Sequence, residues 1–289
     1  MGKILVSGAS GFIGSNLIPY LCSKNKEIVA LTTSKNKKKI FSHDKLYWIY
    51  SKELKVPSDI LRTCDTLIHL ASAGVNQNIE DDLVDIFKAN VVNSYDLILS
   101  CLNSGFKRII YIGSCFEYGH MASVKKNNLN VHDALMPQTQ YSATKAALTA
   151  LLYPLTNYFN AEIRIIRAFQ IYGPNENPDR LYPTIMKAIK TKKAVEITSG
   201  TQLKYFIPVE NLIFSISKIL NNPPKPNYFV LENQGDGRLM TVIDFAKSLF
   251  KDSDLKFDDL VKCKKKSRKG EPKVIAPDLN EKFQHQDFK

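Results

Sequence analysis

Two short runs in this chain carry residue types whose spacing suits chemistry. Gly8, Gly11 and Gly14 form a Gly-x-x-Gly-x-x-Gly run near its start, and Tyr141 precedes Lys145 by four residues in its middle. Glycines so spaced let backbone N–H groups approach a pyrophosphate, and a tyrosine beside a lysine can give up or take a proton. Together the two runs predict that a dinucleotide is bound and that a second molecule is reduced or oxidised beside it.

The residues around the glycines predict a strand, a tight turn and a helix. An apolar run at residues 3–7 is typical of a buried parallel strand, and apolar residues recur at helical spacing over residues 12–21. The start of that helix offers unpaired N–H groups and a partial positive charge to a phosphate. The expected cofactor contacts are Gly8, Gly11, Phe12, Ile13 and Gly14. A glycine-rich turn without a ligand is the alternative.

The end of the second predicted strand, at residues 28–32, indicates which cofactor is bound. An NAD site usually has an Asp or Glu here for the ribose hydroxyls, but this strand runs into Thr33, Ser34 and Lys35, with further lysines close behind. Hydroxyl and ammonium groups suit the additional phosphate of NADPH. We therefore predict that Thr33, Ser34 and Lys35 help to bind NADPH, with NAD possible. The alternative is a solvated lysine loop.

The elements around Tyr141 must place it beside a substrate. Residues 138–159 have a helix-forming composition after Pro137, so Tyr141 and Lys145 can share one helical face. The Lys145 ammonium would then favour the phenolate form of the tyrosine. Ser114 ends an apolar strand, at the sheet edge where ligands bind in open α/β folds, and could hydrogen-bond a substrate carbonyl. The alternative is an exposed tyrosine–lysine pair on a helix.

With these residues in place, the chain resembles the extended short-chain dehydrogenases/reductases, the nucleotide-sugar epimerase/dehydratase superfamily. The resemblance covers nearly the whole length. Its markers are the glycine turn, residues 65–71, Ser114 with Tyr118 and Gly119, Tyr141 with Lys145, residues 167–174, residues 201–210 and residues 268–271.

The resemblance implies a role for individual residues. Tyr141 would be the acid/base, Lys145 its pKa tuner and ribose ligand, and Ser114 the clamp on the carbonyl. Further cofactor contacts would come from Leu70, Ala71, Asn90 and Ala168. The substrate would meet Ser114, Gln170, Arg180, Lys204, Arg268 and Glu271. Lys204 stands where the family often has an arginine. A lysine cannot form the bidentate hydrogen bonds that an arginine makes.

Two departures from the family pattern guide the choice of reaction. The 4,6-dehydratases carry an Asp-Glu pair directly after the small hydroxyl residue, where this chain has Cys115 and Phe116. Epimerases retain NAD, which normally goes with the acidic ribose contact that is absent after residue 32. Residues 69–75 and 113–119 also resemble those of bacterial nucleotide-6-deoxy-4-ketohexose reductases, which make deoxysugars for surface polysaccharides.

We therefore predict the NADPH-dependent reduction of the 4-keto group of a nucleotide-linked hexose. A nucleotide-sugar 4-epimerase with bound NAD is the second reading. A non-catalytic NADP-binding regulator is the third, although such proteins typically lose the tyrosine or the lysine, and this chain has both.

Composition bounds the partners. The chain has 289 residues, 44% of them hydrophobic, and a net charge of +12, but its lysine clusters carry no nucleic-acid motif, and a basic cleft suits NADPH and a sugar nucleotide. No apolar run approaches the ~20 residues of a membrane span, and no signal peptide is evident. Five scattered cysteines and five histidines indicate neither a disulfide framework nor a metal site. We expect a cytoplasmic protein that binds a nucleotide sugar.

The alternation of strands and helices predicts an α/β fold, a Rossmann-type doubly wound parallel sheet with a smaller mixed C-terminal domain. Strands are expected near residues 3–7, 28–32, 46–50, 66–70, 108–112 and 162–167. We assign residues 1–170 to an NAD(P)-binding domain, to which some later segments return, and 171–289 to a substrate-binding domain. Helices are expected at 180–192 and 240–250.

A homodimer is also expected, through the helix that carries Tyr141 and the helix before it. Its apolar surface would come from Ile86, Val91, Leu97, Ile98, Leu102, Leu148, Leu151, Leu152 and Leu155. The alternative is that these residues only pack on the sheet.

Overall fold

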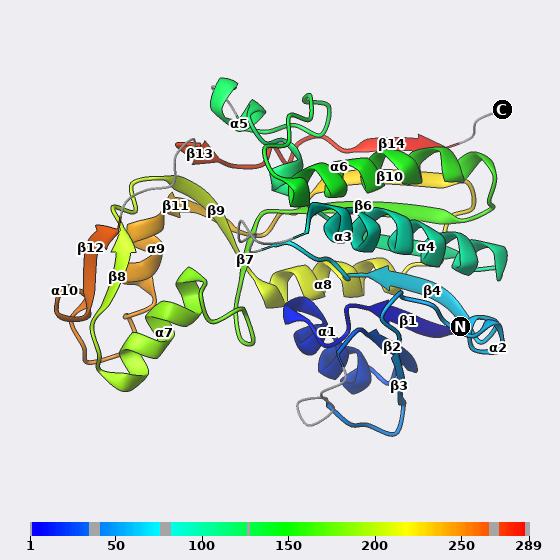
Figure 1. Cartoon of the computed structure of the whole chain (residues 1–289), viewed down its shortest axis with the longest axis horizontal. Helices are drawn as coiled ribbons and strands as arrows, with labels where there is room; N and C mark the ends of the chain where they lie inside the picture. The colour runs from blue at the N-terminus through cyan, green and yellow to red at the C-terminus, as the bar shows by residue number, and fades with distance from the viewer. Residues whose placement is uncertain (1, 35–40, 76–81, 126–127, 266–271, 287–289) are drawn as a thin grey trace.

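The computed structural model describes residues 2–34, 41–75, 82–125, 128–265 and 272–286. An eight-stranded sheet runs through its larger part, in the order β14-β10-β6-β5-β4-β1-β2-β3 (Figure 1). β14 pairs antiparallel with β10, and the other described pairs in this sheet are parallel. The strands are β1 (Lys3–Ser7), β2 (Ile28–Thr32), β3 (Leu46–Tyr50), β4 (Cys64–His69), β5 (Arg108–Ser114), β6 (Glu162–Ala168), β10 (Tyr228–Asn233) and β14 (Phe283–Gln286). The predicted doubly wound α/β fold is confirmed.

Helices cover both faces of this sheet. α1 (Phe12–Ser23) and α8 (Val209–Leu220) pack together on one face, around the apolar residues of β1, β2 and β6 that point toward them. α4 (Asn93–Asn103) and α6 (Gln140–Leu152) cover the other face. The shorter helices of this part are α2 (Ser58–Leu61), α3 (Leu83–Phe87), the π-helix η2 (Lys88–Val92), the 3₁₀ helices η3 (Cys115–Glu117) and η4 (Tyr153–Asn157), and α5 (Met121–Val124).

The smaller part of the molecule lies beside the carboxyl ends of the parallel strands, on the left in Figure 1. Its strands form two small sheets: β7 (Gln170–Tyr172), β9 (Leu203–Pro208), β11 (Arg238–Thr241) and β13 (Val274–Ile275) in one, and β8 (Val195–Thr198) and β12 (Val261–Lys265) in the other. Its helices are α7 (Leu181–Thr191), α9 (Val242–Ser248) and α10 (Phe257–Leu260). The helix predicted at 180–192 is α7.

The helix predicted from residue 240 begins two residues later. Met240 and Thr241 belong to β11, which pairs with β9. Thr241 also caps the helix, because its hydroxyl oxygen accepts a hydrogen bond from the N–H of Asp244 at 3.0 Å. Strand pairing and the cap together decide the boundary.

Segments from the predicted C-terminal domain, residues 171–289, also belong to the large sheet and the helices on it. α8 and β10 follow β9 and lie on the large part, and β14 closes its edge. The large sheet therefore draws on both halves of the sequence, and a domain division near residue 170 stays a prediction. No helix that the structure describes has the length and apolar character of a membrane span.

The apolar residues expected at a dimer interface lie elsewhere. Eight of the nine are buried within the single chain, in the core or against it, and Leu151 is the exposed one, at 39%. The prediction was wrong for the eight because they are already buried inside the chain: six belong to the core cluster against the sheet, and Ile86 packs against Gly74. A homodimer stays a prediction, and it would have to use other side chains of these helices.

Candidate active site

The glycine turn brings β1, α1 and β4 into close contact. Gly8 has φ +68°, and a Cβ built there would lie 2.6 Å from the N atom of Ala71. A Cβ at Gly14 would lie 2.5 Å from the carbonyl oxygens of Gly8 and Ala9. Only glycine fits these two positions, so the backbone of the turn can lie tightly over residues 70–71 and the start of α1.

The start of α1 is open to an anion. Gly11 is its N-cap residue, and no side chain among the described residues caps it. The first N–H groups of a helix lack partners within the helix and carry a partial positive charge. This uncapped terminus, with the space that the glycines leave, fits the pyrophosphate of a dinucleotide.

Asn90 links the segment after β4 to α6. Its Oδ1 accepts a hydrogen bond from the N–H of Ala73 at 2.7 Å, and its Nδ2 donates to the carbonyl of Ala73 and to Oγ1 of Thr144, both at 3.0 Å. The side chain is 3% exposed. With its amide used in this way, Asn90 holds the wall of the site.

His69, the last residue of β4, supports the same wall. Its Nδ1 lies 2.6 Å from Oγ of Ser7, and its ring stacks on Tyr111 with the ring centroids 5.7 Å apart. Burial, and then the nearby charge of Lys145, lower the pKa of His69 to about 3. The imidazole is therefore neutral at physiological pH and part of the packing.

Three polar residues come together at the carboxyl end of β5. Ser114 ends that strand, and Tyr141 and Lys145 lie one turn apart on α6. α6 begins just before Tyr141 because Thr139 and Ser142 form a capping box. The Lys145 ammonium donates a hydrogen bond to the carbonyl of Ile112 at 2.8 Å and lies 4.7 Å from the ring centroid of Tyr111.

The pKa of Tyr141 in this trio differs from the prediction that Lys145 would favour its phenolate form. Burial of the Tyr141 hydroxyl raises its pKa to about 12, although a hydrogen bond to Ser114 acts in the opposite direction. Burial lowers the pKa of Lys145 to about 8, and the charge of Glu117 opposes that change. Desolvation outweighs the lysine's expected effect on the tyrosine, so Tyr141 is protonated at neutral pH and able to act as an acid.

The trio opens into a cavity of about 650 Å³ between the two parts of the molecule. Thirteen predicted site residues line it: Gly8, Gly11, Phe12, Ile13, Gly14, Leu70, Ser114, Tyr141, Lys145, Ala168, Gln170, Arg180 and Lys204. Of the other predicted cofactor residues, Thr33, Ser34, Ala71 and Asn90 lie outside the lining that the described residues form. Lys35, Arg268 and Glu271 fall outside the described residues.

Sequence reasoning missed part of the cavity wall. Tyr172, Glu176, Tyr182 and Gln202 line it as well. Burial raises the pKa of Glu176 to about 7, and its Oε2 has no hydrogen-bond partner among the described residues. A carboxyl group three residues after Gly173 was the available signal, but its burial follows only from the tertiary structure.

No described group of three or more His, Cys, Asp or Glu side chains is arranged to hold a metal ion. Cys115, next to Ser114, is 3% exposed, and burial raises the pKa of its thiol to about 12. It is therefore a packed thiol and not a thiolate.

The chain matches the model of the NAD dependent epimerase/dehydratase family over residues 4–231. It is 25% identical over 272 residues to a dTDP-D-glucose 4,6-dehydratase of Dictyostelium discoideum, covering 86% of this chain and 61% of that protein. It is 26% identical over 254 residues to a UDP-glucuronate 4-epimerase of Thermodesulfobacterium geofontis, covering 82% of this chain and 76% of that protein.

Solved structures share the fold. A UDP-N-acetylglucosamine 4-epimerase from Methanobrevibacter ruminantium, in complex with UDP-N-acetylmuramic acid, superposes with a TM-score of 0.83 at 20% identity. MoeE5 in complex with UDP-glucose and NAD superposes with a TM-score of 0.82 at 22% identity. Each match covers 96% of this chain and 90% of the other.

Proposed function

The chain belongs to the NAD dependent epimerase/dehydratase family, and from that premise we propose that it reduces the 4-keto group of a nucleotide-linked 6-deoxyhexose with NADPH. Such a reaction would serve deoxysugar and surface polysaccharide synthesis. Relatives of this chain are named as dehydratases and epimerases of nucleotide sugars. We infer the substrate class from these relatives, and we infer reduction, rather than dehydration, from the residues of the site.

The observation that carries the proposal is the set of groups beside Tyr141. Elimination of water from a hexose needs an acid and a base in addition to the tyrosine. The two residues after Ser114 are Cys115, whose thiol stays protonated, and Phe116, which lines the cavity. The next carboxyl group in the sequence, Glu117, is buried and paired with Arg167. The cavity also holds the carboxyl group of Glu176, but this group comes from the segment before α7 and not from the residues after Ser114. Reduction of a ketone requires one proton donor, and Tyr141 supplies it.

The end of β2 supports NADPH. Thr32 is followed by the exposed Thr33 and Ser34, and its Oγ1 lies 2.5 Å from Oγ of Ser10. A 2′-phosphate at this end would meet the hydroxyl groups of Thr33 and Ser34, with no carboxylate from residues 32–34 to repel it. The glycine cradle and the uncapped start of α1 fit the pyrophosphate.

The residues of the trio divide the chemistry. Ser114 and the protonated Tyr141 donate hydrogen bonds to the carbonyl oxygen, and these bonds strengthen as negative charge develops on it. A bound nicotinamide cofactor would supply the hydride that joins the carbonyl carbon. Tyr141 then gives its proton to the new alkoxide. Lys145, anchored on the carbonyl of Ile112, stabilises the phenolate left behind and helps to return a proton to it.

A 4-epimerase is the second candidate, because solved neighbours with this fold contain NAD and relatives are named as epimerases. It would use the same tyrosine but keep its cofactor through each turnover. The two candidates differ in whether reduced cofactor is consumed.

The test is the consumption of NADPH or NADH, followed by ultraviolet absorbance, with dTDP-, CDP-, GDP- and UDP-linked 4-keto-6-deoxyhexoses. Tyr141→Phe should lower kcat by about 10²–10⁴-fold, whereas Tyr182→Phe, which removes a hydroxyl elsewhere on the cavity wall, should leave kcat close to that of the wild type. Turnover that prefers NADPH supports the reductase. No oxidation of either cofactor, with NAD retained through purification, supports the epimerase instead.

A further inference from the structure

Glu117 is a buried carboxylate three residues after Ser114. It is fully buried, at 0% exposure. Its Oε1 accepts a hydrogen bond from the N–H of Ser114 at 2.8 Å, and its Oε2 accepts one from Nε of Arg167 at 2.9 Å and one from Oγ1 of Thr149 at 3.0 Å. Three donors therefore meet a single carboxylate in the interior.

Each donor belongs to an element that shapes the active site. Ser114 is the end of β5, and Arg167 lies on β6 next to Ala168, which lines the cavity. Thr149 is on α6, four residues after Lys145 and eight after Tyr141, so the three share one helical face. The Glu117 carboxylate therefore connects Ser114 to α6, the helix that carries Tyr141 and Lys145.

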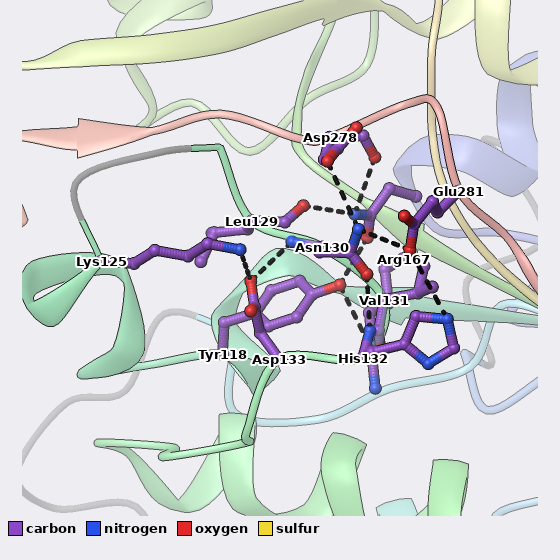
Figure 2. A network of polar contacts seen from close by, with 11 residues as sticks. Tyr118, Lys125, Leu129, Asn130, Val131, His132, Asp133, Arg167, Asp278 and Glu281 are labelled. Carbon is purple, nitrogen blue, oxygen red and sulfur yellow. Dashed lines mark hydrogen bonds and ion pairs between the residues drawn. The ribbon is translucent and has the colours of Figure 1, made fainter.

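The residues around Glu117 fit closely against its carboxylate. A Cβ at Gly113 would lie 2.5 Å from its Oε1, so the strand provides the space by having no side chain there. Arg167 has further partners (Figure 2). Its Nη1 donates to the hydroxyl of Tyr118 at 3.0 Å and to the carbonyl of Val131 at 3.3 Å. These bonds hold the arginine in place beside the carboxylate.

Glu117 also sets the charge around Lys145. The groups around this ammonium are the neutral His69 on β4, the Ile112 carbonyl and the Tyr111 ring on β5, and Glu117, with Tyr141 one turn away on α6. Burial lowers the pKa of Lys145 to about 8, and the charge of Glu117 acts to raise it. Without this negative charge, the lysine would lose its proton at a lower pH.

We propose that Glu117 is a positioning residue for the reaction, holding Ser114 and the helix of Tyr141 and Lys145 in one arrangement and keeping the lysine charged. This role rests on the proposed ketone reduction. A glutamine in its place has one accepting and one donating group. Whichever way the amide turns, a donor faces either Ser114 or Arg167, so the carboxylate's geometry is lost together with its charge.

The fold contains a matched control. Glu162 and Arg108 form a second buried ion pair, each 1% exposed, with Nε of Arg108 2.6 Å from Oε2 of Glu162. The other oxygen of Glu162 accepts a hydrogen bond from Nε of Arg164 at 2.5 Å. This pair joins the same two strands at their opposite ends, away from the trio. Glu162→Gln therefore measures what the loss of a buried carboxylate costs the fold alone.

The experiment compares Glu117→Gln with Glu162→Gln in unfolding, kcat, KM and the pH profile of kcat. Both should lower the unfolding midpoint. Only Glu117→Gln should lower kcat, by about 10–100-fold with little change in KM, because the reacting groups are displaced. The basic limb of the kcat–pH profile of Glu117→Gln should also move to lower pH. Equal effects of the two variants on kcat and on the limb would overturn the proposal.

Two measurements keep the test decisive. If Glu117→Gln does not fold, Thr149→Val removes one contact and keeps the charge: kcat should fall by about 3–10-fold with the basic limb unmoved, and an unchanged kcat refutes the proposal. If the wild type reduces no ketosugar, the proposed reaction fails, and the pH dependence of NADPH affinity decides the role of Glu117. If the basic limb of the NADPH affinity profile lies at lower pH in Glu117→Gln than in the wild type, the proposed role of Glu117 is supported. If the limb is unshifted, the proposal is overturned.

Discussion

Replacing Asn90 by alanine should both destabilise the protein and weaken cofactor binding. The substitution removes three hydrogen bonds of 2.7–3.0 Å, two to Ala73 and one to Thr144, and a longer one of 3.4 Å from the Ser72 hydroxyl. Each contributes about 1 kcal/mol net. Ala73 is only partly buried, so water can satisfy part of its lost bonding. We expect the free energy of unfolding to fall by about 2–3 kcal/mol.

This loss should be visible in thermal and urea unfolding. With roughly 2.1 cal/mol/K of unfolding entropy per residue, a chain of 289 residues should lose about 3–5 °C in Tm. Asn93→Ala is the matched control: it lies at the start of α4, and its side chain makes no hydrogen bond to another residue that the structure describes.

Cofactor titration separates two roles of Asn90. Asn90 is bonded to Ser72, which lines the cavity, and to Ala73 beside it, so NADPH affinity should fall together with stability. If Asn90→Ala weakens NADPH binding but unfolds like Asn93→Ala, the amide contacts the cofactor directly and the positioning argument is refuted. If neither property changes, the hydrogen bonds carry no net energy.

Three further changes test the cavity. Gly14→Ala places a Cβ 2.5 Å from two backbone oxygens, so it should cost about 1–3 kcal/mol and abolish NADPH binding in a fluorescence titration; normal binding would contradict the proposed cradle. Arg180→Ala and Lys204→Ala should each raise KM for the sugar nucleotide by about 10–100-fold with little effect on NADPH affinity, and an unchanged KM in both would place the diphosphate elsewhere. Burial raises the pKa of Glu176 from 4.5 to about 7: the folded state binds the proton more tightly, so the contribution of this group to stability is present below pH 4.5 and is lost as the pH rises through about 7. In Glu176→Gln, the free energy of unfolding, measured in urea across pH, should no longer fall between pH 4.5 and about 7, and KM should no longer rise over that interval. If the variant has the same pH dependence as the wild type, Glu176 does not titrate in this interval.

The sequence alone determined the elements that carry the chemistry. The glycine spacing, the apolar runs and the four-residue interval between Tyr141 and Lys145 are local patterns, because strand and helix periods act over a few residues. The strands predicted at residues 3–7, 28–32 and 46–50 have those bounds in the structure, and thirteen predicted site residues line one cavity.

Only the tertiary structure decided which of those groups are charged and which are buried. Glu117 and Glu176 have the same side chain, yet one is paired with Arg167 in the core and the other faces the cavity with a raised pKa. The apolar residues of α4 and α6 could have faced either a partner or the sheet, and those expected at a dimer interface are buried except for Leu151. Desolvation and charge pairing depend on segments far apart in the chain: Arg167 is 50 residues from Glu117, and no local pattern specifies that they meet.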